Sequence, residues 1–153
     1  LGKDSILWNY EFVSRTYLLN CEDIHNHVPE GERAKRNSYA EGIMDSLHFE
    51  KYNVDIYGIC QYSARNERND FDSVYARNLR AINIFLGHGG SANVCPFEVE
   101  DFGGKNFGYI GLGHKHQYLA FEKQHVYYPG SLEPINEDET GEHGFILDIL
   151  TSN

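Results

Sequence analysis

The chain has 153 residues, of which 41% are hydrophobic and 14% aromatic, and its formal net charge is −10. This length and apolar content suffice for one folded domain that buries roughly 70% of its unfolded surface, and they exclude a disordered chain. The acidic balance argues against a broadly basic, nucleic-acid-binding surface, although bound divalent ions would reverse the potential inside one cleft.

Cysteine usage and hydropathy indicate a reducing, aqueous compartment. Cys21, Cys60 and Cys95 are odd in number and far apart, so neither a disulfide framework nor a zinc ribbon is predicted. No apolar run approaches the ~20 residues that span a bilayer, and the first residues lack a signal-peptide pattern. We expect a cytoplasmic location, and because the chain starts at Leu1 we expect a piece of a longer protein.

The first third of the chain combines one short helix, one strand and a long loop. Residues 4–12 carry an N-capping Asp or Ser before apolar residues and predict a helix, and residues 16–20 (TYLLN) predict a strand. The polar stretch 22–38, with Pro29 and Gly31, predicts a surface loop and is the one plausible linker.

The middle of the chain predicts a hairpin and a helix. Residues 46–50 and 54–60 are β-rich and flank a turn at 51–53. In residues 69–80 the apolar side chains follow one helical face, with Asp70 and Asp72 near its start, so this is the clearest predicted helix.

Two apolar strands then end at histidines. Residues 81–87 (AINIFLG) predict a strand buried on both faces that ends at His88, and residues 107–113 (FGYIGLG) predict a strand that ends at His114 and His116. Short antiparallel strands are predicted at 118–122 and 125–129, and a closing strand at 144–150. This order predicts an α/β fold, half of a mixed-sheet sandwich.

His88, His114 and His116 are the candidate metal ligands. A strand fixes the backbone before each site, flanking glycines let an ion approach, and the i, i+2 spacing sends two imidazoles to one side. The alternative is that strand-end histidines only bond to loop carbonyls. His25 and His27 lie in a polar loop, and His48, His125 and His143 lack a glycine loop, so these five are interpreted as structural or surface residues.

Other polar and glycine-rich segments have simpler interpretations. Glu98, Asp101 and the acidic run 137–139 are expected to be solvated, because their spacing does not direct them toward the histidines. Residues 87–90 lack the Lys-Ser/Thr ending of a P-loop. Tyr127 and Tyr128, before a Pro-Gly turn, are assigned to architecture.

Four motifs in succession resemble one family. Residues 86–89 (LGHG), 113–116 (GHKH), 127–134 (YYPGSLEP) and 141–145 (GEHGF) look like the second half of a calcineurin-like metallophosphoesterase of the SbcD-type, DNA-repair exonuclease branch. The resemblance covers residues 54–150 well. It implies that residues 1–153 are the C-terminal part of one metallophosphoesterase domain, with the mixed-sheet sandwich fold of that type.

The same resemblance implies the chemistry. In the family two divalent ions, usually manganese, polarise a phosphate and activate water. His88 and His114 would serve one ion and His116 the other. The family's Asp-x-His, Gly-Asp-x-x-Asp and Gly-Asn-His-Asp motifs are absent from this sequence, and His25-Asn26-His27 is no substitute because Val28 stands in the aspartate position. No catalytic residue is therefore assigned, and the chain alone is expected to be inactive.

Three functions remain open. The resemblance implies an exonuclease-like subunit that acts on DNA or another phosphodiester and works with an SMC-like ATPase. The acidic balance instead favours an enzyme for small phosphoesters. A non-catalytic domain used for assembly, including a homodimer, is the third, because half a sandwich leaves sheet edges that invite strand pairing.

Overall fold

The computed structural model describes residues 34–39, 44–59, 74–90 and 97–151. The helix predicted at 4–12, the strand predicted at 16–20 and the histidines of the 25–27 segment lie outside these residues. So do Cys21, Cys60 and Cys95.

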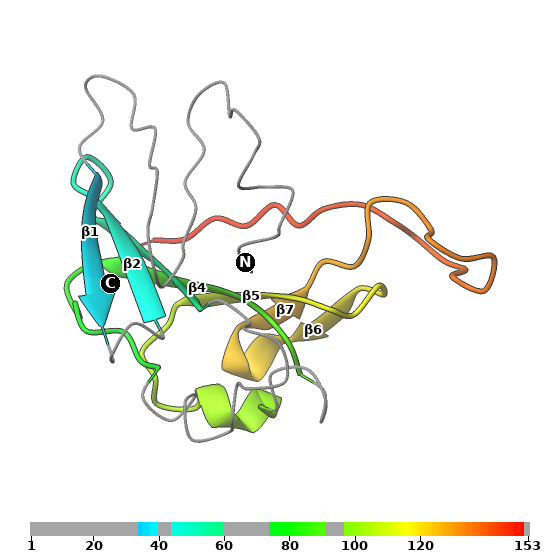
Figure 1. Ribbon diagram of the computed structural model, residues 1–153, viewed down its shortest axis with the longest axis horizontal. Helices are drawn as coiled ribbons and strands as arrows, with labels where there is room; N and C mark the ends of the chain where they lie inside the picture. Colours follow the sequence, from blue (N-terminus) through cyan, green and yellow to red (C-terminus); the bar gives the residue numbers. More distant parts are fainter. Residues whose placement is uncertain (1–33, 40–43, 60–73, 91–96, 152–153) are drawn as a thin grey trace, which may run out of the picture.

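The described residues form one mixed sheet (Figure 1). Its seven strands have the spatial order β1-β2-β3-β4-β5-β7-β6. The strands are β1 (Ala34–Tyr39), β2 (Met44–Phe49), β3 (Val54–Ile59), β4 (Ile82–His88), β5 (Tyr109–Gly113), β6 (Leu119–Phe121) and β7 (Val126–Tyr128). The four strands β3, β4, β5 and β7 run parallel, while β1 and β2 on one side and β6 on the other are antiparallel to their neighbours. The α/β mixed-sheet fold predicted from the sequence is confirmed.

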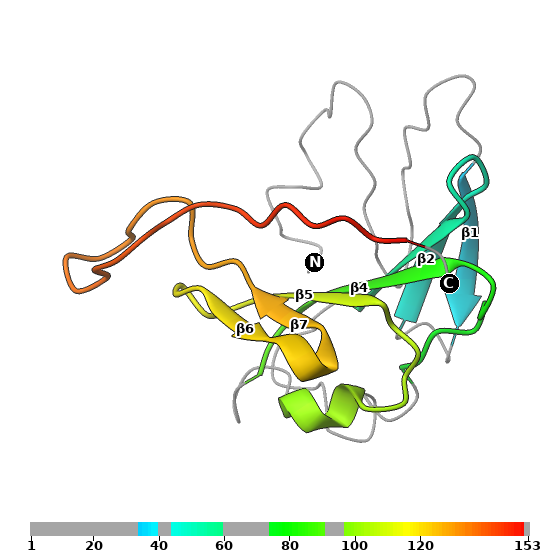
Figure 2. The same cartoon turned by 180° about the vertical axis from the view of Figure 1, so that it is seen from behind.

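One face of the sheet carries the core. Every second side chain of the parallel strands points to this face, because successive residues of a strand point to opposite sides. Phe85 on β4 is one of them and is fully buried. The segment that contains the 3-10 helix η4 (Val99–Phe102) covers this face (Figure 2). The Phe85 ring lies 5.5 Å from that of Phe102 and 5.3 Å from that of Phe107, between ring centroids. Further buried members of the core are Tyr57, Val74, Phe97, Ile110, Leu112, Val126 and Tyr128.

The opposite face is less covered, which corrects one prediction. The strand predicted at 81–87 is confirmed as β4, but it is not buried on both faces, because Leu86 is 43% exposed. The predicted hairpin is confirmed as β2 and β3, joined through a turn in which Asn53 has a φ of 51°. The antiparallel pair β6 and β7 is confirmed as well.

The helix predicted at 69–80 is wrong for the residues that can be compared. Residues 74–80 are not helical, and residues 69–73 lie outside the described part. Val74 and Ala76 are buried while Tyr75 between them is 42% exposed, so this stretch follows a period of two. The backbone N–H of Ala76 donates to the carbonyl of Lys105 at 2.8 Å. A distant segment therefore satisfies a group that a helix would have bonded internally.

Two other predictions need correction. The loop predicted at 22–38 overlaps β1, which begins at Ala34. The closing strand predicted at 144–150 is absent: this segment, red in Figure 1, forms no strand, and its large apolar side chains Phe145, Leu147 and Ile149 are 81%, 86% and 85% exposed. The apolar pattern that predicted a strand therefore faces solvent, and none of the described strands pairs with this segment.

Candidate metal centre

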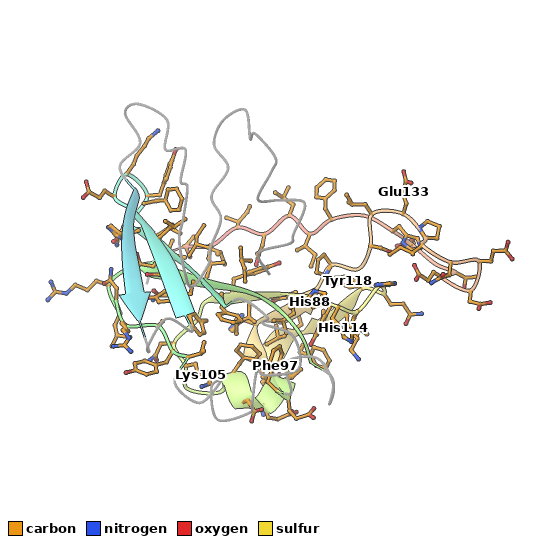
Figure 3. All side chains as sticks on the ribbon, in the orientation of Figure 1. His88, Phe97, Lys105, His114, Tyr118 and Glu133 are labelled. Atoms are coloured by element: carbon orange, nitrogen blue, oxygen red, sulfur yellow. The ribbon has the colours of Figure 1, made fainter. Side chains whose placement is uncertain are left out.

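Parallel pairing brings two of the three predicted histidines together. In the β4–β5 pair His88 is aligned with Gly113, so the carboxyl ends of both strands meet at one sheet edge. His88 closes β4 and His114 directly follows β5. Their ring centroids are 5.4 Å apart at an interplanar angle of 73° (Figure 3). Ligands commonly bind at this edge of parallel sheets.

Glycines make room for the His88 ring and its loop. A Cβ added to Gly113 would lie 2.8 Å from Nδ1 of His88, so any larger residue would displace the imidazole. Gly90 has a φ of 95°, and a Cβ there would collide with the hydroxyl of Tyr128. That hydroxyl donates to the carbonyl of Gly89 at 3.4 Å. Tyr128 thus supports the loop after β4, in agreement with its architectural assignment.

The backbone at His114 is strained. Its φ is 95°, in a region that residues other than glycine rarely adopt. Such a conformation costs on the order of 1–3 kcal/mol and persists where the surroundings enforce it, often at functional sites. The strain turns His114 out of the strand direction immediately after β5.

Electrostatics favour a neutral imidazole at His88. Burial lowers the pKa of His88, and the charges of His114 and His116, when those rings are protonated, lower it further. Only the neutral ring has a lone pair for a metal ion. His88 is therefore in the form that ligation requires over a wider pH range than an exposed histidine.

His116 is held by a carboxylate that sequence reasoning had placed in solvent. Nδ1 of His116 lies 2.6 Å from Oε1 of Glu139. The backbone N–H of Ile135 donates to Oε2 of Glu139 at 2.9 Å, and this bond is the main cause that lowers the pKa of Glu139 to about 2. The solvated-loop interpretation is wrong for Glu139, whereas Glu137 and Asp138 are exposed as expected.

The remaining candidates have structural partners. His48 bonds to Asp55, and His143 contacts Ser131 and the carbonyl of Glu139. Asp101 accepts from the backbone N–H of Glu98 at 2.8 Å, which caps η4. His125 follows the 3-10 helix η5 (Glu122–Gln124), at the opposite end of the parallel strands from His114.

The donor set suits a divalent ion but is incomplete. Within the described ranges no three side chains of His, Cys, Asp or Glu are grouped closely enough to hold a metal by themselves. His88 and His114 offer adjacent imidazoles. His116 directs its Nδ1 to an ionised acceptor, which leaves its Nε2 available. The chemistry of these donors fits a transition-metal ion that takes further ligands from elsewhere.

A pocket of about 570 Å³ adjoins His116. Its lining includes Tyr118, Glu139, His143 and Phe145. Aromatic and polar side chains therefore meet beside one of the predicted ligands, as they do in sites that receive small molecules or parts of larger substrates.

Comparison with known proteins gives one informative match. YhaO of Bacillus subtilis (strain 168), described as an uncharacterised metallophosphoesterase, is 33% identical over 108 residues, which cover 65% of this chain. This chain spans about a quarter (26%) of the length of that relative. No family model matches the chain, and no solved structure matches it. The similarity supports the calcineurin-like metallophosphoesterases as a superfamily and does not distinguish the SbcD-type branch.

None of the helices in the described residues has the length and apolar content needed to span a bilayer.

Proposed function

We propose that this chain is part of a metal-dependent phosphoesterase and contributes His88, His114 and His116 to a site for two divalent ions. The observation that carries the proposal is the pairing of His88 and His114, with ring centroids 5.4 Å apart, at the carboxyl ends of two parallel strands. The similarity to a metallophosphoesterase supports the same chemistry.

Each histidine has a separate task in this proposal. His88 and His114 hold one ion, and His116 holds the other. The lowered pKa of His88 keeps its ring neutral and so ready to bind. Two bound divalent ions, manganese in this proposal, would supply Lewis-acid polarisation of the phosphate and activation of water.

The finer assignment is an SbcD-type exonuclease subunit that cleaves DNA together with an SMC-like ATPase. It is supported by the succession of motifs at 86–89, 113–116, 127–134 and 141–145. Close contacts between the motifs support it as well: a Cβ on Gly113 would lie 2.8 Å from Nδ1 of His88, and a Cβ on Gly130 would lie 2.8 Å from the carbonyl oxygen of His116.

The test is manganese binding to the 153-residue chain by calorimetry near neutral pH. We expect binding that is lost when His114 and His116 are both changed to alanine. His125→Asn is the matched control, because it removes an imidazole at the opposite end of the sheet and asparagine tolerates the left-handed backbone at that position, where φ is 55°. Equal binding by all three proteins would refute the assignment of these ligands.

A second candidate acts on small phosphoesters. The net charge of −10 favours it, because an acidic surface repels a polyanion such as DNA. Salt dependence separates the two. Duplex binding through phosphate contacts weakens steeply as salt is raised, whereas an enzyme for small phosphoesters shows no duplex binding at any salt concentration.

A further inference from the structure

We propose that Glu139 is a positioning residue for His116: its carboxylate holds the Nδ1–H of the imidazole, so that the Nε2 lone pair is presented to the metal site. This inference rests on the proposed function for the role of His116 as a ligand. Its geometric part, the control of the ring by Glu139, stands on the hydrogen bond of 2.6 Å between Nδ1 of His116 and Oε1 of Glu139.

Glu139 is held firmly enough to orient another side chain. Its side chain is 13% exposed, against 46% for His116. Oε1 also accepts from the amide of Asn136 at 3.1 Å. Oε2 accepts from the backbone N–H of Ile135 at 2.9 Å and from the hydroxyl of Ser131 at 3.5 Å. Because both oxygens are engaged, the carboxylate cannot swing away without breaking several hydrogen bonds.

The backbone of His116 is tied to the same segment. The carbonyl of His116 accepts from the backbone N–H of Ser131 at 3.0 Å. Gly130, with a φ of 81°, lets the chain approach, since a Cβ there would lie 2.8 Å from that carbonyl oxygen. Residues 130–139 therefore hold both the ring and the backbone of His116 in place.

The hydrogen bond to Glu139 prepares His116 to bind a metal ion. An ionised carboxylate only accepts hydrogen bonds, so the proton must lie on Nδ1 of a neutral His116 ring. That tautomer places the lone pair on Nε2, where it can bind a metal ion. Loss of such a partner typically lowers metal affinity by roughly 10–100-fold.

The experiment has two readouts on the full chain. Nitrogen NMR of the metal-free protein, at a pH where imidazole is neutral, reports the tautomer of His116, and calorimetry reports manganese affinity. We expect the Nδ1–H tautomer of His116 in the wild type and a mixture of both tautomers in Glu139→Ala. The Glu139→Ala variant should also bind manganese roughly 10–100-fold more weakly than the wild type. Glu139→Gln keeps an acceptor of the same shape, so it should retain more of both properties even if Glu139→Ala fails to fold.

Glu137→Gln is the control, since it removes an equal charge from an exposed position in the same segment. An unchanged His116 tautomer in the Glu139 variants, or an unchanged affinity beside a changed tautomer, would overturn the positioning role. If the wild type binds no manganese, the proposed function fails instead. The tautomer in the metal-free chain then still decides whether Glu139 controls the ring.

Discussion

At the scale of single residues, the absence of a side chain at Gly113 matters as much as the imidazole of His88. The two residues are aligned across β4 and β5, and the ring occupies the space in which a Cβ of residue 113 would stand. The position of one candidate ligand therefore depends on a glycine in the neighbouring strand.

Gly113→Ala should displace the His88 ring and weaken manganese binding. An added methyl 2.8 Å from Nδ1 forces the ring to move, and overpacking of this kind costs about 1–3 kcal/mol. Calorimetry and urea unfolding measure both effects. Gly144→Ala is the control, because a Cβ there meets nothing within 4 Å. Equal affinity in the two variants would show that the His88 ring has room.

Ionisation of Tyr127 should make the free energy of unfolding fall as the pH rises in the alkaline range. Burial, together with the hydrogen bond to Glu122, raises its pKa from 10.0 to about 12. The unfolded chain loses this proton first, so the stabilising contribution is complete below pH 10 and is lost as the pH rises toward 12. Urea unfolding over this range should show a steeper loss for the wild type than for Tyr127→Phe. Parallel curves would contradict the raised pKa.

At the scale of elements, the two faces of β4 should contribute differently to the free energy of unfolding. Phe85 is fully buried against aromatic rings, while its neighbour Leu86 is 43% exposed on the other face. Successive side chains of a strand point to opposite sides, so one step along the chain separates core from surface.

Phe85→Ala should therefore destabilise the protein far more than Leu86→Ala. We expect a loss of about 3–5 kcal/mol for Phe85, which leaves a cavity. For Leu86 we expect less than about 1 kcal/mol, as is usual for exposed positions. Urea unfolding of both variants provides the comparison. Similar losses would mean that the outer face of β4 is covered as well as the inner one.

At the scale of the whole molecule, the described residues supply an incomplete donor set. Histidines are present at the carboxyl ends of β4 and β5, yet no group of three potential ligands stands complete in the described ranges. The carboxylate motifs that the family resemblance calls for do not occur in the sequence. A complete two-metal site would need further ligands beyond those that the described residues bring together.

The 153-residue chain should accordingly show little or no hydrolysis of a chromogenic phosphodiester when manganese is added. Two-metal hydrolysis requires both ions to be held in a defined arrangement, and three imidazoles cannot hold two ions that closely. The assay is run on the wild type and on His88→Ala. Robust activity that is lost in the variant would contradict the prediction by showing that the chain holds a complete site.

The sequence by itself determined the elements whose signal is local. The apolar runs that became β4 and β5, the hairpin of β2 and β3, and the glycines beside His88 and His114 were predictable, because a strand's periodicity and a glycine's freedom depend on a few neighbouring residues. Only the tertiary structure decided the rest. Residues 74–80 have helical spacing, but the backbone of Ala76 donates to Lys105, and residues 144–150 have a strand-like sequence, but they form no strand and expose their large apolar side chains.

Glu139 reaches His116 across 23 positions of the chain. No local pattern encodes that contact, because it depends on where the pairing of the parallel strands places His116 and where the segment after β7 places Glu139. The same holds for the His88–His114 pair, whose partners come from separate strands. The sequence identified the three histidines as candidate ligands, but their positions relative to one another and to Glu139 depend on long-range packing.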